Sequence, residues 1–268
     1  MANFRKCDSI EKATKTMEKL EKIVKFLDKY LKIRDIKDIT WNGLQVEGNP
    51  NVNQVVFTEN ASLDTFKMAL KEKADLIVVH HGHFWKEENP SLIKDSKERV
   101  EFLLKNGISL YVAHLPLDRH KEVGNNAQLL KLLGAKIKSE FSVYKGKNVG
   151  WIGEFSRPLP VGEIVKKINS KLNTNCKTLL FGKNKIKTIA VCSGGGNYKD
   201  FNEAIDKEVD LYLTGDAIDI YPSTKDAKFN VIFAGHYATE TVGVNALMKV
   251  VGKRLKIETT YIDDPTGL

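Results

Sequence analysis

The 268-residue sequence is poor in cysteine and in long apolar runs, and each shortage excludes a class of protein. Its three cysteines, Cys7, Cys176 and Cys192, are widely spaced and form no C-x-x-C pair, which argues against a disulfide framework and favours reduced thiols. No apolar stretch approaches the roughly 20 residues that span a bilayer. The N-terminal residues are charged and polar and lack an apolar signal core. We therefore expect a soluble cytoplasmic protein without a membrane partner.

Arginine is also scarce, although the formal net charge is +8. Lysine carries most of this charge and alternates with acidic residues, as in residues 18–22, which is typical of solvated helix faces. A nucleic-acid surface would instead show clustered arginine with interleaved aromatic residues. We therefore expect no nucleic-acid partner, whereas the positive field would attract a small anionic substrate.

Segments with strand and helix patterns alternate along the chain, which predicts an α/β fold. An amphipathic helix is expected over residues 9–33, with Ser9 as its N-cap. The strands that follow are predicted at 54–57, 76–79 and 110–113. The helices between and after them are predicted at 62–73, 96–105 and 124–133. A second unit is expected to begin at 142–147, and its first helix to cover 161–172.

The second half of the chain then repeats an order seen in the first half. Residues 55–80 and 189–216 both give an apolar strand, a polar turn, a helix and a second apolar strand. Residues 109–118 and 230–240 both give an apolar strand, a histidine, three residues and an acid. This pattern predicts two similar, pseudo-duplicated α/β domains with mixed, mostly parallel sheets. The alternative is a chance match between two common strand–helix–strand patterns.

Five of the six histidines lie at or just beyond the ends of apolar runs: His80, His81, His83, His114 and His236. The carboxyl ends of parallel strands are where ligands bind in such sheets. Adjacent residues on a regular strand face opposite ways, but at the end of a strand His80 and His81 can splay and reach two different metal ions. A lone histidine there is often an ordinary polar group, so the prediction depends on the whole set.

Two acids, Asp118 and Glu240, each follow one of these histidines by four residues. If a helix begins near His236, positions i and i+4 share a face, so His236 and Glu240 converge. Pro116 limits helix formation after His114, and a turn is expected to direct Asp118 towards it. Imidazole and carboxylate without thiolate suit catalytic Zn, Mn or Fe. Two such ions lower the pKa of a bound water and clamp an oxyanion.

Two loops of the second half are expected near the same cleft. Ser193–Gly196 follows a strand and precedes a helix, so it is either a cradle for an anion or a plain tight turn. Thr214-Gly215-Asp216 ends a strand at the position that His80 and His81 occupy in the first half. Trp85 and Tyr237 are expected either to line the pocket or to pack.

With these residues, the sequence resembles the dinuclear-metal family called GTP cyclohydrolase I type 2 homologues, or Ngg-interacting-factor-three-like proteins. The resemblance spans nearly the whole chain and is carried by HHGHFW at 80–85, AHLPLD at 113–118 and GHYATE at 235–240, and more loosely by residues 42–46 and 213–216. It implies two divalent metal ions per chain (Zn, Mn or Fe), held by His80, His81, Asp118, His236 and Glu240. Glu240 would bridge the ions, and His114 would stand beside them as an acid/base group or an orienting residue.

The resemblance also implies how the chain is divided and assembled. Residues 1–142 and 236–268 would form a first domain with most of the metal ligands, and 143–235 an inserted second domain. The chains would assemble into a toroidal homohexamer. Asp216 stands where many relatives carry glutamate. We expect a dinuclear metal-dependent hydrolase of a small nucleotide-like or phosphorylated substrate, or alternatively a metal-binding hexameric scaffold or regulatory protein without turnover.

Overall fold

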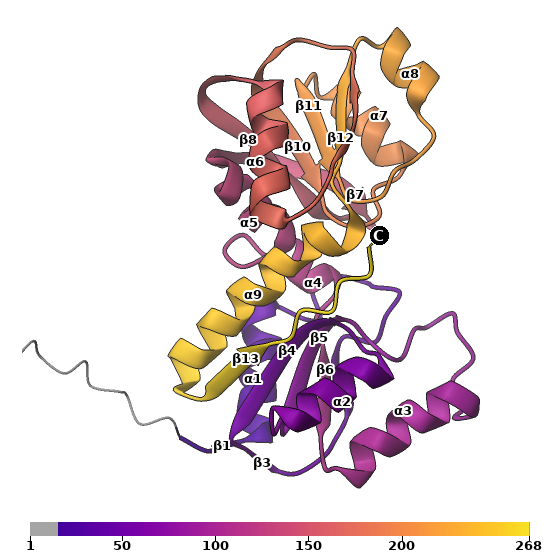
Figure 1. Ribbon diagram of the computed structural model, residues 1–268, viewed down its shortest axis with the longest axis vertical. Helices are drawn as coiled ribbons and strands as arrows, with labels where there is room; N and C mark the ends of the chain where they lie inside the picture. Colours follow the sequence, from indigo (N-terminus) through magenta and orange to yellow (C-terminus); the bar gives the residue numbers. More distant parts are fainter. Residues whose placement is uncertain (1–15, 268) are drawn as a thin grey trace, which may run out of the picture.

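The computed structural model describes residues 16–267, which form two α/β units stacked along the long axis of the molecule (Figure 1). Each unit is built on one large mixed sheet with helices on both faces. The long helix α9 (His236–Leu255) starts beside the second unit and runs along the first. The predicted α/β fold with mixed sheets is therefore confirmed.

The first sheet has the strand order β13-β4-β5-β6-β2. Its strands are β2 (Gly43–Val46), β4 (Gln54–Asn60), β5 (Leu76–His81), β6 (Ser109–Val112) and β13 (Glu258–Tyr261). All neighbouring pairs are parallel except β2 with β6. A short antiparallel pair, β1 (Glu18–Lys19) with β3 (Asn51–Val52), stands apart from it.

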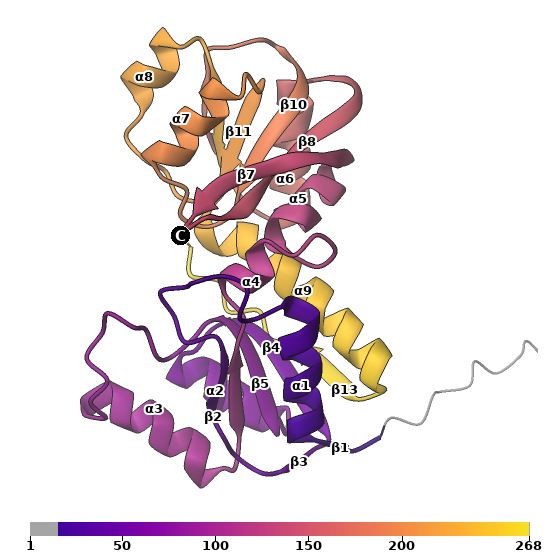
Figure 2. The ribbon, with the colours of Figure 1, turned by 180° about the vertical axis from the view of Figure 1, so that it is seen from behind.

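Both faces of this sheet are apolar because its inner strands are covered on each side. Val55 and Phe57 pack with α1 (Leu20–Leu31) and α9, whereas Val56 packs with α2 (Leu63–Lys71) and α3 (Lys94–Lys105). This alternation follows from the two-residue period of a strand. Figure 1 shows α2 and α3 in front of the sheet, and Figure 2 shows α1 on the opposite side.

The second sheet has the strand order β7-β8-β10-β11-β12-β9. Its strands are β7 (Ala135–Tyr144), β8 (Lys147–Pro160), β9 (Lys177–Leu180), β10 (Lys185–Cys192), β11 (Leu211–Thr214) and β12 (Asn230–Phe233). The central strands β10, β11 and β12 are parallel to each other, and the other neighbours are antiparallel. The expectation of mostly parallel strands therefore holds for the first sheet and is wrong for the second.

Helices cover the second sheet as they cover the first. One face packs with α5 (Asn125–Leu133) and α6 (Val161–Leu172), and the other with α7 (Tyr198–Asp206). The short helix α8 (Tyr221–Asp226) connects β11 to β12. Within residues 16–267, no helix is long and apolar enough to cross a bilayer.

The repeat predicted from the sequence corresponds to the topology. In each unit, three successive parallel strands are connected by helices, and an antiparallel strand from earlier in the chain borders the third of them: β2 borders β6 of β4-β5-β6, and β9 borders β12 of β10-β11-β12. The predicted strands at 54–57, 76–79 and 110–113 correspond to β4, β5 and β6. The predicted helices at 62–73, 96–105, 124–133 and 161–172 correspond to α2, α3, α5 and α6.

The predicted helix over 9–33 is too long where the structure describes it. The helix α1 begins at Leu20, because residues 18–19 pair with β3 and Lys19 has an extended backbone. It ends at Leu31, where Lys32 adopts a left-handed conformation. Ser9, the expected N-cap, lies outside the described residues.

The second sheet also begins earlier than the sequence indicated. The strand β7 starts at Ala135 and pairs with β8 over its length, so the expected start of the second unit at 142 falls inside a strand. Residues 136–140 are exposed on this edge strand and give no apolar alternation that would reveal it.

Candidate metal centre

The carboxyl ends of three strands of the first sheet meet the first turn of α9. Three overlapping groups of side chains there have ligand atoms within 4.8 Å of one another and could hold a metal ion: His80-His81-His114, His81-His236-Glu240 and Glu59-His80-Glu240. The last two residues of β5 are His80 and His81. The sequence-predicted residues are therefore brought together in space.

The two adjacent histidines both reach Glu240 although a strand would direct them apart. The Nε2 atom of His80 lies 3.5 Å from Glu240 Oε1, and that of His81 lies 3.2 Å from Glu240 Oε2. His80 is fully buried, whereas the His81 side chain is partly exposed. The strand ends at His81, which permits both side chains to turn towards Glu240. That they reach two different metal ions stays a prediction.

The first turn of α9 supplies the second histidine–carboxylate pair. Gly235 precedes it with φ +92°, a conformation that favours glycine, and His236 is the first helical residue. One turn later, Glu240 places Oε2 3.1 Å from His236 Nε2. The predicted convergence at i and i+4 is thus present. The two Glu240 oxygens face different imidazoles, which is an arrangement suited to a bridging carboxylate.

Each of the four clustered imidazoles is held at Nδ1 by an oxygen atom outside the cluster. The pairs are His80 with Ala113 O (2.8 Å), His81 with Asn60 Oδ1 (2.8 Å), His114 with Asp38 Oδ1 (2.9 Å) and His236 with Asp216 Oδ2 (2.9 Å). A hydrogen bond donated by Nδ1 leaves Nε2 with a lone pair, and such bonds orient metal-binding histidines. Asp216 contacts His236 in this way, but it lines a separate cavity and not the one in front of the cluster, so the expectation that its loop faces the same cleft is not met.

Asp118 reaches the cluster from α4 (Leu115–Asp118), the short helix that replaces the predicted turn. Its Oδ1 accepts hydrogen bonds from Asn125 Nδ2 (2.8 Å) and Ser193 Oγ (3.1 Å). Its Oδ2 lies 3.5 Å from His80 Nε2. The sequence predicted a turn towards His114, but the ion-pair contact of Asp118 is with His80, whereas the His114 Nδ1 atom pairs with Asp38.

Asp38 is a buried residue of the site that the sequence did not reveal. Its carboxylate accepts hydrogen bonds from His114 Nδ1, from Asn42 Nδ2 (2.7 Å) and from the Leu115 N–H (3.0 Å). Burial alone would raise the pKa of Asp38, but these contacts outweigh it and hold the pKa at about 2. Asp38 is therefore an ionised group that fixes the orientation of His114. No motif around it in the sequence indicates this role.

Glu59 is the second residue that the sequence analysis missed. It is 1% exposed, near the end of β4, and shares one of the three groups with His80 and Glu240. Burial raises the pKa of Glu59 to about 8, although the nearby His80 opposes this shift. A signal was present, because Glu59 continues the two-residue period of Val55 and Phe57, and an acid in that phase points into the core.

Burial and the neighbouring carboxylates shift the pKa values of the clustered histidines in opposite directions. Burial alone would lower the pKa of His80, but the Asp118 and Glu240 carboxylates outweigh it and raise that pKa well above its usual value. Burial lowers the pKa of His81 to about 3 against the attraction of Glu240. Burial alone would lower the pKa of His236, but the nearby Glu240 carboxylate outweighs it and raises the pKa to about 9. Neighbouring imidazoles thus have opposite preferences for a proton.

A cavity of about 560 Å³ opens onto this cluster. It is lined by residues from both units, among them Trp85, Tyr144, Lys145 and Lys199. The Trp85 ring stands edge-on to the His114 ring at a centroid distance of 5.3 Å, so Trp85 lines the pocket, one of its two expected roles.

The Ser193–Gly196 loop is a packed turn. Its N–H groups already donate to side chains of this unit and of α9: Ser193 to Asn126 (2.6 Å), Gly194 to Thr239 (2.9 Å) and Gly196 to Thr214 (3.1 Å). These three donors are not available to an anion, which favours the tight-turn alternative for the loop. A Cβ on Gly194 would lie 2.0 Å from Glu240 Oε1, and glycine is needed for this approach.

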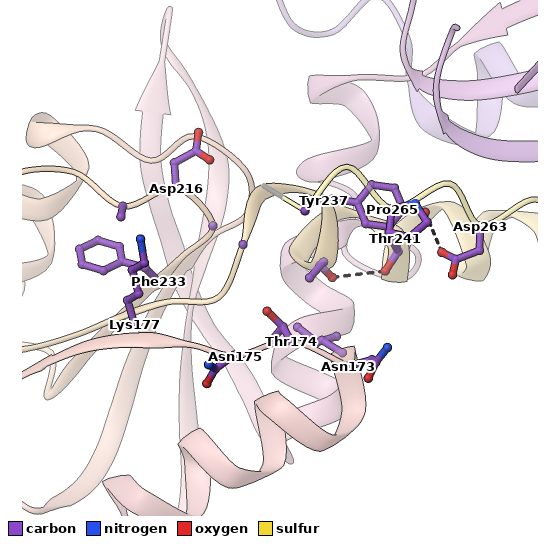
Figure 3. Close-up of a pocket in the computed structure, with 16 residues that line it drawn as sticks. Asn173, Thr174, Asn175, Lys177, Asp216, Phe233, Tyr237, Thr241, Asp263 and Pro265 are labelled. Atoms are coloured by element: carbon purple, nitrogen blue, oxygen red, sulfur yellow. Dashed lines mark hydrogen bonds between the residues drawn. The ribbon is translucent and has the colours of Figure 1, made fainter. Parts of the chain in front are cut away.

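Two other predicted positions face away from the cluster. Tyr237 lines a separate cavity of about 590 Å³, shown in Figure 3, where its hydroxyl donates to Asp263 Oδ1 (2.7 Å). His83 lies beyond β5, and its Nε2 pairs with Ser96 Oγ at 3.0 Å. Neither residue belongs to the three groups that could hold a metal ion.

The sequence and the fold both match known proteins. The family described as Duf34/NIF3 (NGG1p interacting factor 3) matches residues 18–266. This chain belongs to the Duf34/NIF3 family. A relative from Pyrococcus abyssi, named GTP cyclohydrolase 1 type 2 homolog, is 45% identical over 251 residues, which are 92% of this chain and 99% of that protein. A protein of the same name from Archaeoglobus fulgidus is 42% identical over 251 residues, covering 93% and 99% of the two chains.

Several solved structures share the architecture of this chain. The protein ybgI, described as of unknown function, superposes with a TM-score of 0.88 at 33% identity, covering 94% of this chain and 100% of the other. TTHA1606 from Thermus thermophilus gives a TM-score of 0.80 at 33% identity, with 94% and 100% coverage. Reduced HcgD from Methanocaldococcus jannaschii gives 0.81 at 23% identity, covering 93% and 99%, and this likeness concerns the fold alone.

The donor atoms of this Duf34/NIF3 chain fit a divalent cation. Among residues 16–267, buried atoms without a hydrogen-bond partner include both carboxylate oxygens of Glu59, Nε2 of His80 and Oε2 of Glu240. Buried polar atoms are normally satisfied, and leaving them unsatisfied destabilises the fold. A cation among these atoms would satisfy them together, and imidazole with carboxylate is the donor set of Zn, Mn or Fe.

Proposed function

We propose that this protein is a dinuclear divalent-metal-dependent hydrolase that acts on a small nucleotide-like or phosphorylated substrate. The observation that carries the proposal is the position of Glu240, whose two oxygens face His80 on one side and His81 and His236 on the other. The two ions, Zn, Mn or Fe, would be held by five residues: His80, His81, Asp118, His236 and Glu240. When bound, they would supply Lewis-acid chemistry for hydrolysis at neutral pH.

The protein side chains would hold the reacting groups and move protons. His114 is the proposed acid/base group, because Asp38 fixes its Nδ1 and its ring lines the cavity beside His81. With Nδ1 donating to a carboxylate, Nε2 can accept a proton and return it. Asp38 would stabilise the protonated ring during that transfer.

The cavity supports a small anionic substrate. Its volume of about 560 Å³ is in the range of small-molecule sites. Lys145 and Lys199 on its wall would attract phosphate or another anion, and Trp85 and Tyr144 offer aromatic faces to a planar ring. The name of the relatives suggests GTP as one candidate, and GTP ring opening is therefore part of the screen below.

We also propose that the chains form the toroidal homohexamer that the resemblance implies. Several large apolar side chains are exposed on the single chain, including Trp41 (58%), Leu92 (48%) and Ile93 (57%), and such surfaces often mark contacts between chains. A molecular mass of six chains by light scattering is expected, and a monomeric mass would refute this part. The division into domains at 142 and 236 and the cytoplasmic location stay predictions.

The experiment that tests the function compares metal-stripped and metal-loaded protein against nucleotides, GTP and phosphodiesters. We expect hydrolysis only in the loaded protein, and its loss in Glu240→Ala. Lys225→Ala changes an exposed residue of the short helix α8, which lies at the end of the second unit away from α9 (Figure 1). It serves as the surface control and should leave turnover unchanged. A bound metal without turnover of any substrate would favour the scaffold alternative.

A further inference from the structure

Glu59 is a buried acid for which the five proposed ligands leave no role. It is 1% exposed, and neither of its carboxylate oxygens has a hydrogen-bond partner within residues 16–267. A carboxyl group buried without a partner strongly destabilises the folded chain. Its presence at this buried position therefore points to a ligand that satisfies it.

The sheet places Glu59 beside the cluster. Asn60 pairs with His81 across the parallel strands β4 and β5, and Glu59 and His80 each stand one residue earlier. Their side chains consequently share the face that carries Phe57 and Val78, which α9 covers and on which Glu240 lies. The apolar residues on this face are thus followed by three residues with polar side chains: Glu59 and His80 near the ends of the strands, and Glu240 on α9.

The ligand atoms of these three residues are close enough for one ion. Atoms of Glu59, His80 and Glu240 lie within 4.8 Å of one another, and all three residues are buried. His80 Nε2 also lacks a hydrogen-bond partner in the described part of the chain, and its Nδ1 is already bonded to Ala113. Two unsatisfied carboxylate oxygens therefore face an unsatisfied imidazole nitrogen in a region closed to solvent.

We propose that Glu59 is a sixth protein ligand of the metal centre and binds the divalent ion held by His80. The inference rests on the proposed metal centre and extends it, since it gives the His80 side a carboxylate from β4 in addition to Asp118 and Glu240. The more exposed side, with His81 and His236, has the cavity in front of it. An ion on the His80 side would consequently be the more enclosed of the two.

The test measures binding of Zn²⁺ and Mn²⁺ by chelator competition in the full-length protein and in Glu59→Gln, which keeps the shape and removes the charge. We expect the parent to bind two ions per chain, and Glu59→Gln to bind one of them at least about tenfold more weakly. Thr58→Val is the matched control, because Thr58 is also buried with an unpartnered hydroxyl but stands one residue away on the same strand, in the phase of Val56. Its two affinities should equal those of the parent.

The outcomes separate this inference from the proposed function. Two ions in the parent with unchanged affinities in Glu59→Gln would overturn the role of Glu59 alone. A parent that binds no ion would overturn both. If Glu59→Gln does not fold, anomalous scattering from Zn²⁺-loaded parent crystals decides: a Glu59 oxygen within about 2.0–2.2 Å of a metal peak is expected, and a Glu59 carboxylate turned away from both peaks would contradict the proposal.

Discussion

The two sheets of this protein share a core of three parallel strands with one antiparallel edge strand, but they differ in the residues at the ends of those strands. In the first sheet, β4 and β5 end in Glu59, Asn60, His80 and His81, which contact the cluster directly. In the second sheet, β11 is followed by Gly215 and Asp216. Asp216 contacts His236 at Nδ1, the ring nitrogen that points away from Glu240. One sheet therefore supplies candidate ligands, and the other supplies support. Similar topology does not require similar chemistry at equivalent strand ends.

The glycines of the second sheet explain how it supports the site. A Cβ on Gly194 would meet Glu240, and one on Gly215 would lie 2.6 Å from the Gly194 carbonyl oxygen and 2.8 Å from Thr239 Oγ1. The loops that contain Gly194 and Gly215 therefore pack against the first turn of α9 so closely that neither position has room for a side chain. Glu240 is held in place by this packing as well as by its histidine partners.

The largest expected effect comes from removing a residue of the ligand-bearing sheet. His81→Ala should lower the affinity for at least one metal ion by about 100-fold or more, because direct ligands matter at least as much as the groups that orient them. Metal content after dialysis, measured by elemental analysis, checks this. Retention of two ions by His81→Ala would show that the first sheet is not the ligand-bearing one.

A glycine substitution in the second unit, which supports the site, should lower the stability of the folded protein. Gly194→Ala places a methyl group against Glu240 at a position with φ +62°, and we expect a loss of about 3 kcal/mol or more. Gly146→Ala is the matched control, since Gly146 also has positive φ (+82°) but nothing lies within 4 Å of its Cβ position. It should lose only about 1–2 kcal/mol. Equal losses in thermal or urea unfolding would contradict the close packing.

Asp38 makes the stability of the folded protein depend on pH, and this effect belongs to the first unit. Its pKa in the folded protein is about 2, below the value of the unfolded chain, so its stabilising effect is present above about pH 4 and is lost as the pH falls towards 2. Asp38→Asn should therefore lose about 2 kcal/mol of stability at pH 7 and show a smaller decline between pH 4 and pH 2 than the parent. Parallel stability curves for the two proteins over that interval would refute this assignment.

The smallest effect is expected at Asp216. Asp216→Asn retains an oxygen that can accept the hydrogen bond from His236 but removes the negative charge, and Asp216 is partly exposed. Metal affinity should fall by no more than about tenfold. A loss as large as that of His81→Ala would mean that the second sheet binds metal as well as supporting the ligands.

The sequence was most informative where a local pattern carried the information. The apolar runs before His80, His114 and His236 predicted strand ends, and the spacing of His236 and Glu240 predicted their convergence on one helical turn. Asp38 could not be found in this way, because its contact with His114 joins residues 76 positions apart. The start of the edge strand β7 at Ala135 could not be found either, because its exposed residues carry no apolar period.

The central claim is a pair of divalent ions held mainly by residues of the first sheet and α9. The most direct measurement is the metal content of the purified chain after it is stripped and reloaded with Zn, Mn or Fe, determined by elemental analysis against protein concentration. The account predicts about two ions per chain, and a content of one ion or fewer for each of the three metals would contradict it.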